Sequence, residues 1–108
     1  MLRLPDYVSR EDALLEVGAG WSALVNRAYD VLEKYPTLKV VQVKEKFGGL
    51  RIYTDGYIEE FEIILRELEY ESFNVCETCG DPGKLRGGGW YKTLCEEHSN
   101  GREAIEPF

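Results

Sequence analysis

Apolar residues recur at steps of three and four along two long stretches of the chain, and each stretch predicts an amphipathic helix. In residues 21–35 the apolar stripe consists of Trp21, Leu24, Val25, Ala28, Val31, Leu32 and Tyr35. Pro36 follows, and we expect it to end the helix because the residue before a proline is pushed out of the helical region. In residues 57–71, with Asp55 as the expected N-cap, the stripe consists of Tyr57, Phe61, Ile64, Leu65 and Leu68.

A shorter helix is predicted near the start of the chain. Ser9 can cap it, and Glu11 and Asp12 would lie in its first turn, where carboxylates interact favourably with the helix dipole. The segment Gly18-Ala19-Gly20 breaks the pattern, so we expect this helix to end before it.

A β-hairpin is predicted between the two long stretches. Residues 38–45 (LKVVQVKE) are rich in valine and partly alternating, and residues 50–54 (LRIYT) form the expected partner strand. The turn falls at Phe47-Gly48-Gly49. The alternation does not identify the buried face, because one side would carry Val41, Val43 and Phe47 and the other Leu38 and Val40.

Three cysteines and the only histidine of the chain fall within a short window near the C-terminus. Cys76, Cys79, Cys95 and His98 follow the pattern Cys-x2-Cys-x15-Cys-x2-His, which fits a tetrahedral zinc site made of two short knuckles. We expect one structural Zn²⁺, because four protein ligands leave no position for a catalytic water. Alternatives are buried core cysteines with a surface histidine, a redox Cys-x2-Cys pair and an iron–sulfur cluster.

The resulting order predicts the α+β class: an N-terminal helix, a β-hairpin, a second long helix, and a small zinc-ribbon or treble-clef-like module. The length of 108 residues predicts a single domain, with a helix–hairpin–helix part at 1–73 and the metal-binding module at 74–98. We expect Trp90 and Leu94 to be the apolar contacts of this module. Residues 87–89, all glycine, should form a hairpin tip, Cys95 to His98 the first turn of a short helix, and residues 99–108 a short helix or a loose tail.

An enzymatic role is not expected. If the metal takes every cysteine and the histidine, no thiol nucleophile and no imidazole base remain for catalysis. The sequence contains no Gly-x-Ser-x-Gly, P-loop, Gly-x-Gly-x-x-Gly or His-Glu-x-x-His motif. A carboxylate or serine mechanism is the remaining catalytic alternative.

The chain is acidic, with a net charge of -7 and a pI near 4.7, which argues against a general affinity for nucleic acid or an anionic membrane. No apolar run approaches the roughly 18 residues of a transmembrane helix, and the first residues lack a signal-peptide core, so a cytoplasmic location is expected. The charge is uneven, since residues 57–71 carry six glutamates and one arginine, whereas residues 39–51 carry four cations and one glutamate. The glutamates form either a solvated helix face or an acidic docking surface.

The cationic segments also carry aromatic residues, namely Phe47, Tyr53, Trp90 and Tyr91. Cations interleaved with aromatic rings can hold phosphates and stack bases, whereas in the alternative interpretation the rings are core and the cations pair with glutamates. For Phe47, Gly48, Gly49 and Leu50 we favour a structural role, with positive φ at the glycines and the apolar pair buried under the metal module. The candidate partner-binding cations are Lys44, Lys46, Arg51, Lys84, Arg86 and Lys92.

Three blocks of the sequence resemble a group of small zinc-knuckle proteins of bacteriophages, prophages and bacteria. The blocks are Gly20-Trp21 with the apolar residues after it, KEKFGGLR at residues 44–51, and the segment from the Cys76 knuckle to His98. The similarity covers most of residues 20–98 in the same order. It implies a zinc-binding fold and a phage or bacterial setting, and it implies nothing about catalysis because the group has no established activity.

These observations favour a small, acidic, zinc-stabilised protein that acts by binding a protein partner, such as a phage accessory or inhibitor protein in the bacterial host cytoplasm. Its acidity would favour approach to a basic protein surface. The alternative is a nucleic-acid-binding zinc module that uses the cationic hairpin and the zinc loop, with binding that weakens steeply as salt rises.

Overall fold

The computed structural model describes residues 7–105 and has the α+β class predicted from the sequence. The N-terminal helices are α1 (Arg10–Glu16) and α2 (Ser22–Leu32), with a short 3-10 turn η1 (Ala19–Trp21) between them. The hairpin of β1 (Lys39–Lys46) and β2 (Gly49–Asp55) follows, then α3 (Glu59–Ser72) and a second small hairpin of β3 (Lys84–Arg86) and β4 (Lys92–Leu94). The four cysteine and histidine side chains lie next to this second hairpin.

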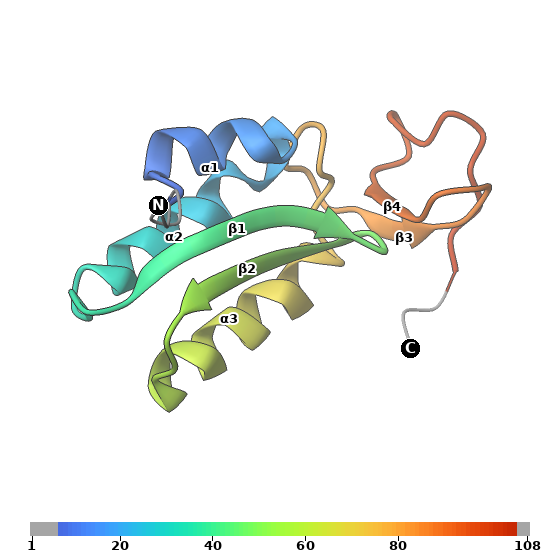
Figure 1. Cartoon of the computed structure of the whole chain (residues 1–108). Helices are drawn as coiled ribbons and strands as arrows, with labels where there is room; N and C mark the ends of the chain where they lie inside the picture. The colour runs from blue at the N-terminus through green and yellow to red at the C-terminus, as the bar shows by residue number, and fades with distance from the viewer. Residues whose placement is uncertain (1–6, 106–108) are drawn as a thin grey trace, which may run out of the picture.

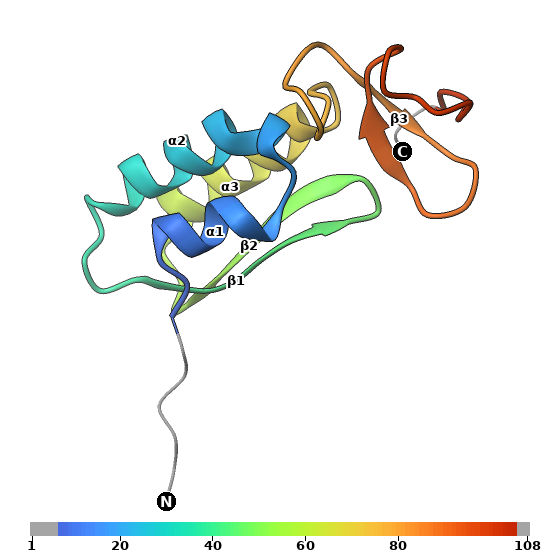
Figure 2. The ribbon, with the colours of Figure 1, turned by 90° about the horizontal axis from the view of Figure 1, so that it is seen from above.

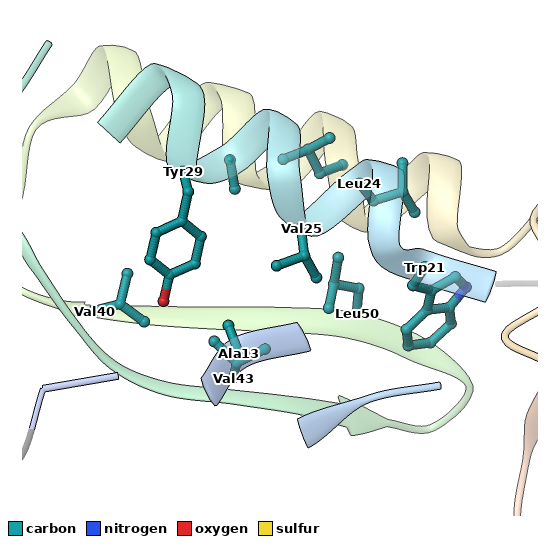
Figure 3. Packing of buried hydrophobic residues seen from close by; sticks show 10 residues of the cluster. Ala13, Trp21, Leu24, Val25, Tyr29, Val40, Val43 and Leu50 are labelled. Atoms are coloured by element: carbon teal, nitrogen blue, oxygen red, sulfur yellow. The ribbon is translucent and has the colours of Figure 1, made fainter. Parts of the chain in front are cut away.

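The first hairpin forms the front of the larger body of the protein, and the helices lie behind it (Figures 1 and 2). Both hairpins are antiparallel two-stranded sheets, and the second extends to one side, beyond the tip of the first. The core lies between the first hairpin and the helices, where α1, α2 and the two strands meet (Figure 3). Its fully or nearly fully buried members include Ala13, Trp21, Leu24, Val25, Tyr29, Val40, Val43 and Leu50.

The predicted cap of α1 is confirmed, since the Asp12 N–H donates to Ser9 Oγ at 3.1 Å. The predicted end of α2 is wrong by three residues. The N–H groups of Lys34 and Tyr35 donate to the carbonyls three residues earlier, which tightens the chain into a turn ahead of Pro36. The restriction that a proline places on its predecessor therefore ends the regular helix at Leu32.

The predicted start of α3 is also wrong. Asp55 is not its N-cap but the last residue of β2, and its carboxylate accepts a hydrogen bond from the Tyr7 hydroxyl. The N-cap is Ile58, whose extended backbone carbonyl accepts the first helical bonds. Tyr57 consequently precedes the helix and is 70% exposed, while Phe61 and Leu68 of the predicted stripe are buried.

A β-bulge in the first hairpin explains why its alternation did not identify a buried face. Val40 pairs with Thr54 and Gln42 with Tyr53, so Val41 is an extra residue in β1. The extra residue shifts the phase of the strand by one position. Val40 and Val43 therefore both face the core, although an unbroken alternation would place them on opposite faces.

The tip of the first hairpin differs from the expectation in two ways. Positive φ falls on Phe47 (54°) and Gly48 (85°), as a two-residue type I′ turn requires, and not on Gly49. Gly49 is needed for space instead, because an added Cβ would lie 2.6 Å from Cζ of Phe73. Leu50 is buried as expected, but Phe47 is 47% exposed because the turn directs its ring outward.

Replacing Phe47 by asparagine should stabilise the fold. A bulky side chain in the left-handed region costs on the order of 1–2 kcal/mol, and Asn-Gly is the pair that type I′ turns favour. We expect Phe47→Asn to raise the free energy of unfolding by about 1 kcal/mol in urea titrations. An unchanged or lower stability would mean that the ring contributes more through its contacts than its backbone conformation costs.

Candidate metal centre

Two turns bring the four predicted ligands together. Cys76 and Cys79 lie in a tight turn bounded by the Val75–Pro82 bridge, where the Gly80 N–H donates to the Cys76 carbonyl at 2.8 Å. Gly80 adopts a φ of 86°, a left-handed conformation that glycine tolerates and that lets the chain turn directly after the second cysteine. Cys95 directly follows β4, and His98 lies one turn further on, with its N–H bonded to the Cys95 carbonyl.

The ligand atoms have the spacing of a single coordination shell. All four lie within 4.8 Å of one another. Cys79 Sγ and Cys95 Sγ are 3.7 Å apart, and His98 Nδ1 is 3.9 Å from Cys76 Sγ and 3.1 Å from Cys95 Sγ. A tetrahedron with metal–sulfur bonds of about 2.3 Å has edges of about 3.8 Å, whereas a disulfide would need about 2.05 Å. The cluster is therefore suited to one metal ion, and its three cysteines are free thiols.

Backbone N–H groups are directed at the sulfur atoms. Burial by itself raises the pKa of the Cys76 thiol, but the N–H groups of Cys95, Cys79 and Thr78 outweigh it and lower that pKa to about 6. The Asp81 N–H lowers the pKa of Cys79, but the neighbouring thiols of Cys95 and Cys76 raise it to about 11. Three thiolates at these distances repel one another, so holding all three deprotonated requires a cation between them.

The first knuckle packs against η1, the turn that leads into α2. The Gly20 N–H donates to the Glu77 carbonyl at 2.9 Å, and Trp21 Nε1 donates to the Val75 carbonyl at 2.8 Å. Gly18 and Gly20 allow this approach, because a Cβ on either residue would overlap a carbonyl oxygen of the knuckle. Gly20 and Trp21, which the sequence places at a helix break and at the start of an apolar stripe, therefore also hold the metal module in place.

The second contact of the module is with the tip of the first hairpin. Thr93 is fully buried, and its Oγ1 donates to the Gly48 carbonyl at 2.6 Å. Gly48 also makes room for the Leu85 side chain, which an added Cβ would overlap. Beside this contact, the Leu50 N–H donates to Ser72 Oγ, which ties the hairpin to the end of α3. Thr93 and Ser72 gave no recognisable sequence pattern, since each acts through a single tertiary hydrogen bond.

Replacing Thr93 by valine should weaken this second contact without changing the volume of the core. The Gly48 carbonyl would stay buried and lose its partner, which costs about 1–3 kcal/mol. We expect Thr93→Val to lower the free energy of unfolding by that amount and to leave the metal content unchanged, as measured by urea titration and native mass spectrometry. Thr93→Ser keeps the hydroxyl and is the control for loss of the bond.

The contacts expected of Trp90 and of the C-terminal segment need correction. Leu94 is buried as expected, but Trp90 is 63% exposed, and its Nε1 donates to Glu45 Oε1 at 2.9 Å. Residues 96–98 form a turn and not a helix, because the chain turns back toward β3. The segment up to Ile105 then pairs with β3, whose Leu85 carbonyl accepts the Ile105 N–H. Residues 1–6 and the last three residues of the predicted tail lie outside the described range.

The six candidate partner-binding cations do not form one surface. Lys44 and Lys46 extend from β1 over the rings of Tyr53 and Phe47, and Lys84 is exposed on β3. Arg51 faces Glu69 at 3.3 Å, and Lys92 pairs with Glu77 at 3.1 Å. Arg86 is buried, and its guanidinium binds the carbonyls of Leu94 and Arg102 inside the metal module. The cations of the zinc loop are thus largely occupied within the protein.

Comparisons with known proteins add no assignment: no family model matches the chain, and no curated protein or solved structure is detectably similar to it. Among residues 7–105, none of the helices combines the length and the apolar character that crossing a bilayer requires.

Proposed function

We propose that Cys76, Cys79, Cys95 and His98 bind one Zn²⁺ whose role is structural. The donor set of three sulfurs and one imidazole nitrogen is one that zinc favours, and it supplies all four positions of a tetrahedral shell. The buried apolar cluster of the module consists of Cys76, Leu94 and Cys95, and Leu85 is also buried; these side chains are too small an apolar core to hold the second hairpin. The metal therefore takes the place of a core.

The protein is proposed to act without catalysis. Its only thiols and its only imidazole belong to the metal set, so a zinc-loaded chain offers neither group as a nucleophile or general base. The shell is filled by protein ligands, which also leaves no position for a zinc-bound water.

The proposed activity is the binding of a protein partner. The single observation that carries it is a set of exposed rings at the junction of the two hairpins: Phe47 (47% exposed), Trp90 (63%) and Tyr91 (39%), with the Phe47 and Tyr91 rings 6.5 Å apart in an edge contact. Exposed aromatic residues are enriched at the centres of protein interfaces. A phage or bacterial setting, and a role as an accessory or inhibitor protein in the host cytoplasm, would suit a chain of this size and charge.

The nucleic-acid alternative has less support. It needs the hairpin and the zinc loop to combine their cations, but Arg86 is buried and Lys92 is paired with Glu77. Binding to a phosphate backbone depends on the number of phosphates that cations neutralise. The cations that stay available are too few for tight binding by an acidic chain.

Site-specific photo-crosslinking tests partner binding. Benzoylphenylalanine replaces Phe47 or Tyr91, and the chain is irradiated in cells that naturally encode it. The control position is Tyr57, which is 70% exposed just after β2, at the opposite end of the first hairpin from the junction. We expect discrete protein adducts from positions 47 and 91 that resist nuclease and are absent from position 57. Adducts that nuclease removes would support the nucleic-acid alternative, and equal adducts at all three positions would contradict the proposal.

A further inference from the structure

The outer face of the first hairpin is an unpaired sheet face of unusual composition. Val43 and Leu50 point toward the helices and are buried, and Figure 2 shows α2 and α3 on that side of the hairpin. Alternate residues point the other way, because successive side chains of a strand face opposite sides. We call this outer surface the open face, and it carries Gln42, Lys44, Lys46, Arg51 and Tyr53.

The three cations of the open face are close together, and among the described residues two of them, Lys44 and Lys46, have no carboxylate partner, whereas Arg51 is paired with Glu69 of α3. Lys44 and Arg51 are direct cross-strand partners, an arrangement in which like charges destabilise a sheet. Within residues 7–105, neither Lys44 nor Lys46 has a carboxylate at ion-pair distance, and each ammonium lies over an aromatic ring instead, at 5.7 Å from the Tyr53 centroid and 5.8 Å from that of Phe47. Arg51 has one contact, to Glu69.

The tip of the same hairpin carries a second energetic cost. Phe47 holds a bulky side chain at positive φ, which directs its ring outward beside Lys46 and against Tyr91. Residues kept in costly conformations cluster at functional sites. The like-charge pair Lys44–Arg51 and the strained turn residue Phe47 thus lie on one short surface. An anionic ligand there would reduce the charge repulsion, and the outward ring of Phe47 would give it an apolar contact.

We propose that the open face binds an extended acidic segment of the protein partner, with carboxylates at alternate positions followed by an apolar residue. Lys44 and Lys46 are two residues apart on one strand, so their backbones are separated by about 6.8 Å. An extended segment with acidic residues at every second position presents carboxylates at the same spacing. The next position on that side of the segment reaches Phe47 and Tyr91, which supply the apolar contact. This inference rests on the proposed protein-binding function and assigns its site and ligand chemistry.

A peptide test separates this proposal from its alternatives. The probe is a fluorescein-labelled peptide containing Glu-Ser-Glu-Ser-Leu, and its controls are the Gln-Ser-Gln-Ser-Leu peptide and one of the same composition with adjacent glutamates. We expect the zinc-loaded chain to bind the first peptide at least tenfold more tightly than either control, as measured by fluorescence anisotropy. Equal binding of all three peptides would overturn the proposal.

Charge reversal assigns the site. The double variant Lys44→Glu with Lys46→Glu should weaken binding of the alternating peptide by about tenfold or more, because two attractive contacts become repulsive. Lys34→Glu with Lys84→Glu changes the net charge equally at exposed positions outside the open face and should leave binding within about twofold. An equal loss in both variants would reduce the effect to net charge and overturn the assignment.

Two further outcomes would also overturn it. Tighter binding of a ten-residue oligothymidine, lost on the same charge reversal, would assign the face to single-stranded nucleic acid. A dimer in native mass spectrometry that the reversal dissociates would assign it to a second copy of the chain. If the peptides fail to bind while Phe47 still crosslinks to protein, the ligand chemistry is wrong and the protein-binding function stands.

Discussion

Removal of the metal is expected to unfold the C-terminal module and to take most of the stability of the protein with it. Structural zinc contributes on the order of 10 kcal/mol or more in small zinc domains, as much as the whole free energy of unfolding of a typical chain of this size. Among the described residues the module has only a small buried apolar cluster, and its two contacts are with η1, which leads into α2, and with the tip of the first hairpin. Chelation should therefore also destabilise α2 and the first hairpin.

Trp21 is the appropriate reporter for this loss. It is fully buried, and its Nε1 donates to the Val75 carbonyl just before the first knuckle, whereas Trp90 is already exposed. In a Trp90→Phe background, we expect a chelator to shift Trp21 emission to longer wavelength. The melting temperature should fall by more than 10 °C, since each kcal/mol of lost stability lowers it by about 4–8 °C in a small domain. Added Zn²⁺ should reverse both changes, and added Mg²⁺ should not.

A cysteine variant provides the matched control. Cys76→Ser removes a buried ligand, so the variant should start with the low melting temperature and show no further response to chelator. A wild-type chain that holds no metal and melts at the same temperature with and without chelator would contradict the structural role of zinc.

Adding one methyl group at Gly20 should also have a large effect. The new Cβ would overlap the Cys76 carbonyl oxygen and lie 2.6 Å from the Gly80 nitrogen, and both atoms belong to the backbone of the first knuckle. Neither can rotate away as a side chain would, because both are backbone atoms of a knuckle fixed by its own hydrogen bonds. We expect Gly20→Ala to cost about 3 kcal/mol or more of stability and to displace the knuckle from η1.

Gly87→Ala is the control for this substitution. Gly87 has no positive φ, and its added Cβ would meet only Ile105 Cγ2, at an ordinary 3.8 Å. Its stability should stay within about 0.5 kcal/mol of the wild type in urea titrations. If Gly20→Ala were equally mild, the knuckle would not pack against η1 as the structure describes.

The two proposals concern different parts of the molecule and can fail separately. The zinc site is a property of the Cys3His cluster, and its loss should weaken partner binding by releasing Tyr91 and the hairpin tip. The open face belongs to the first hairpin, and its charge reversals should leave the metal content unchanged. A variant that loses binding but keeps one zinc per chain would therefore locate binding on the open face.

The sequence by itself determined the local features of this protein. The periodicity of apolar residues predicted the helices and the hairpin. In a helix, residues three or four positions apart share a face, and in a strand, residues two positions apart share a face. The spacing of Cys76, Cys79, Cys95 and His98 gave the metal cluster, because each knuckle is closed within four residues. The cap at Ser9 was equally local.

Tertiary structure decided what depends on residues distant in the sequence. The Val41 bulge selected the buried face of β1, since an extra residue reverses the alternation that the sequence shows. Contacts across more than forty positions fixed the roles of the hairpin tip, where Thr93 binds Gly48 and Glu45 binds Trp90. The structural role of Arg86 and the exposure of Phe47 have the same origin. Burial and ion pairing depend on how the whole chain packs, and the sequence pattern alone does not reveal them.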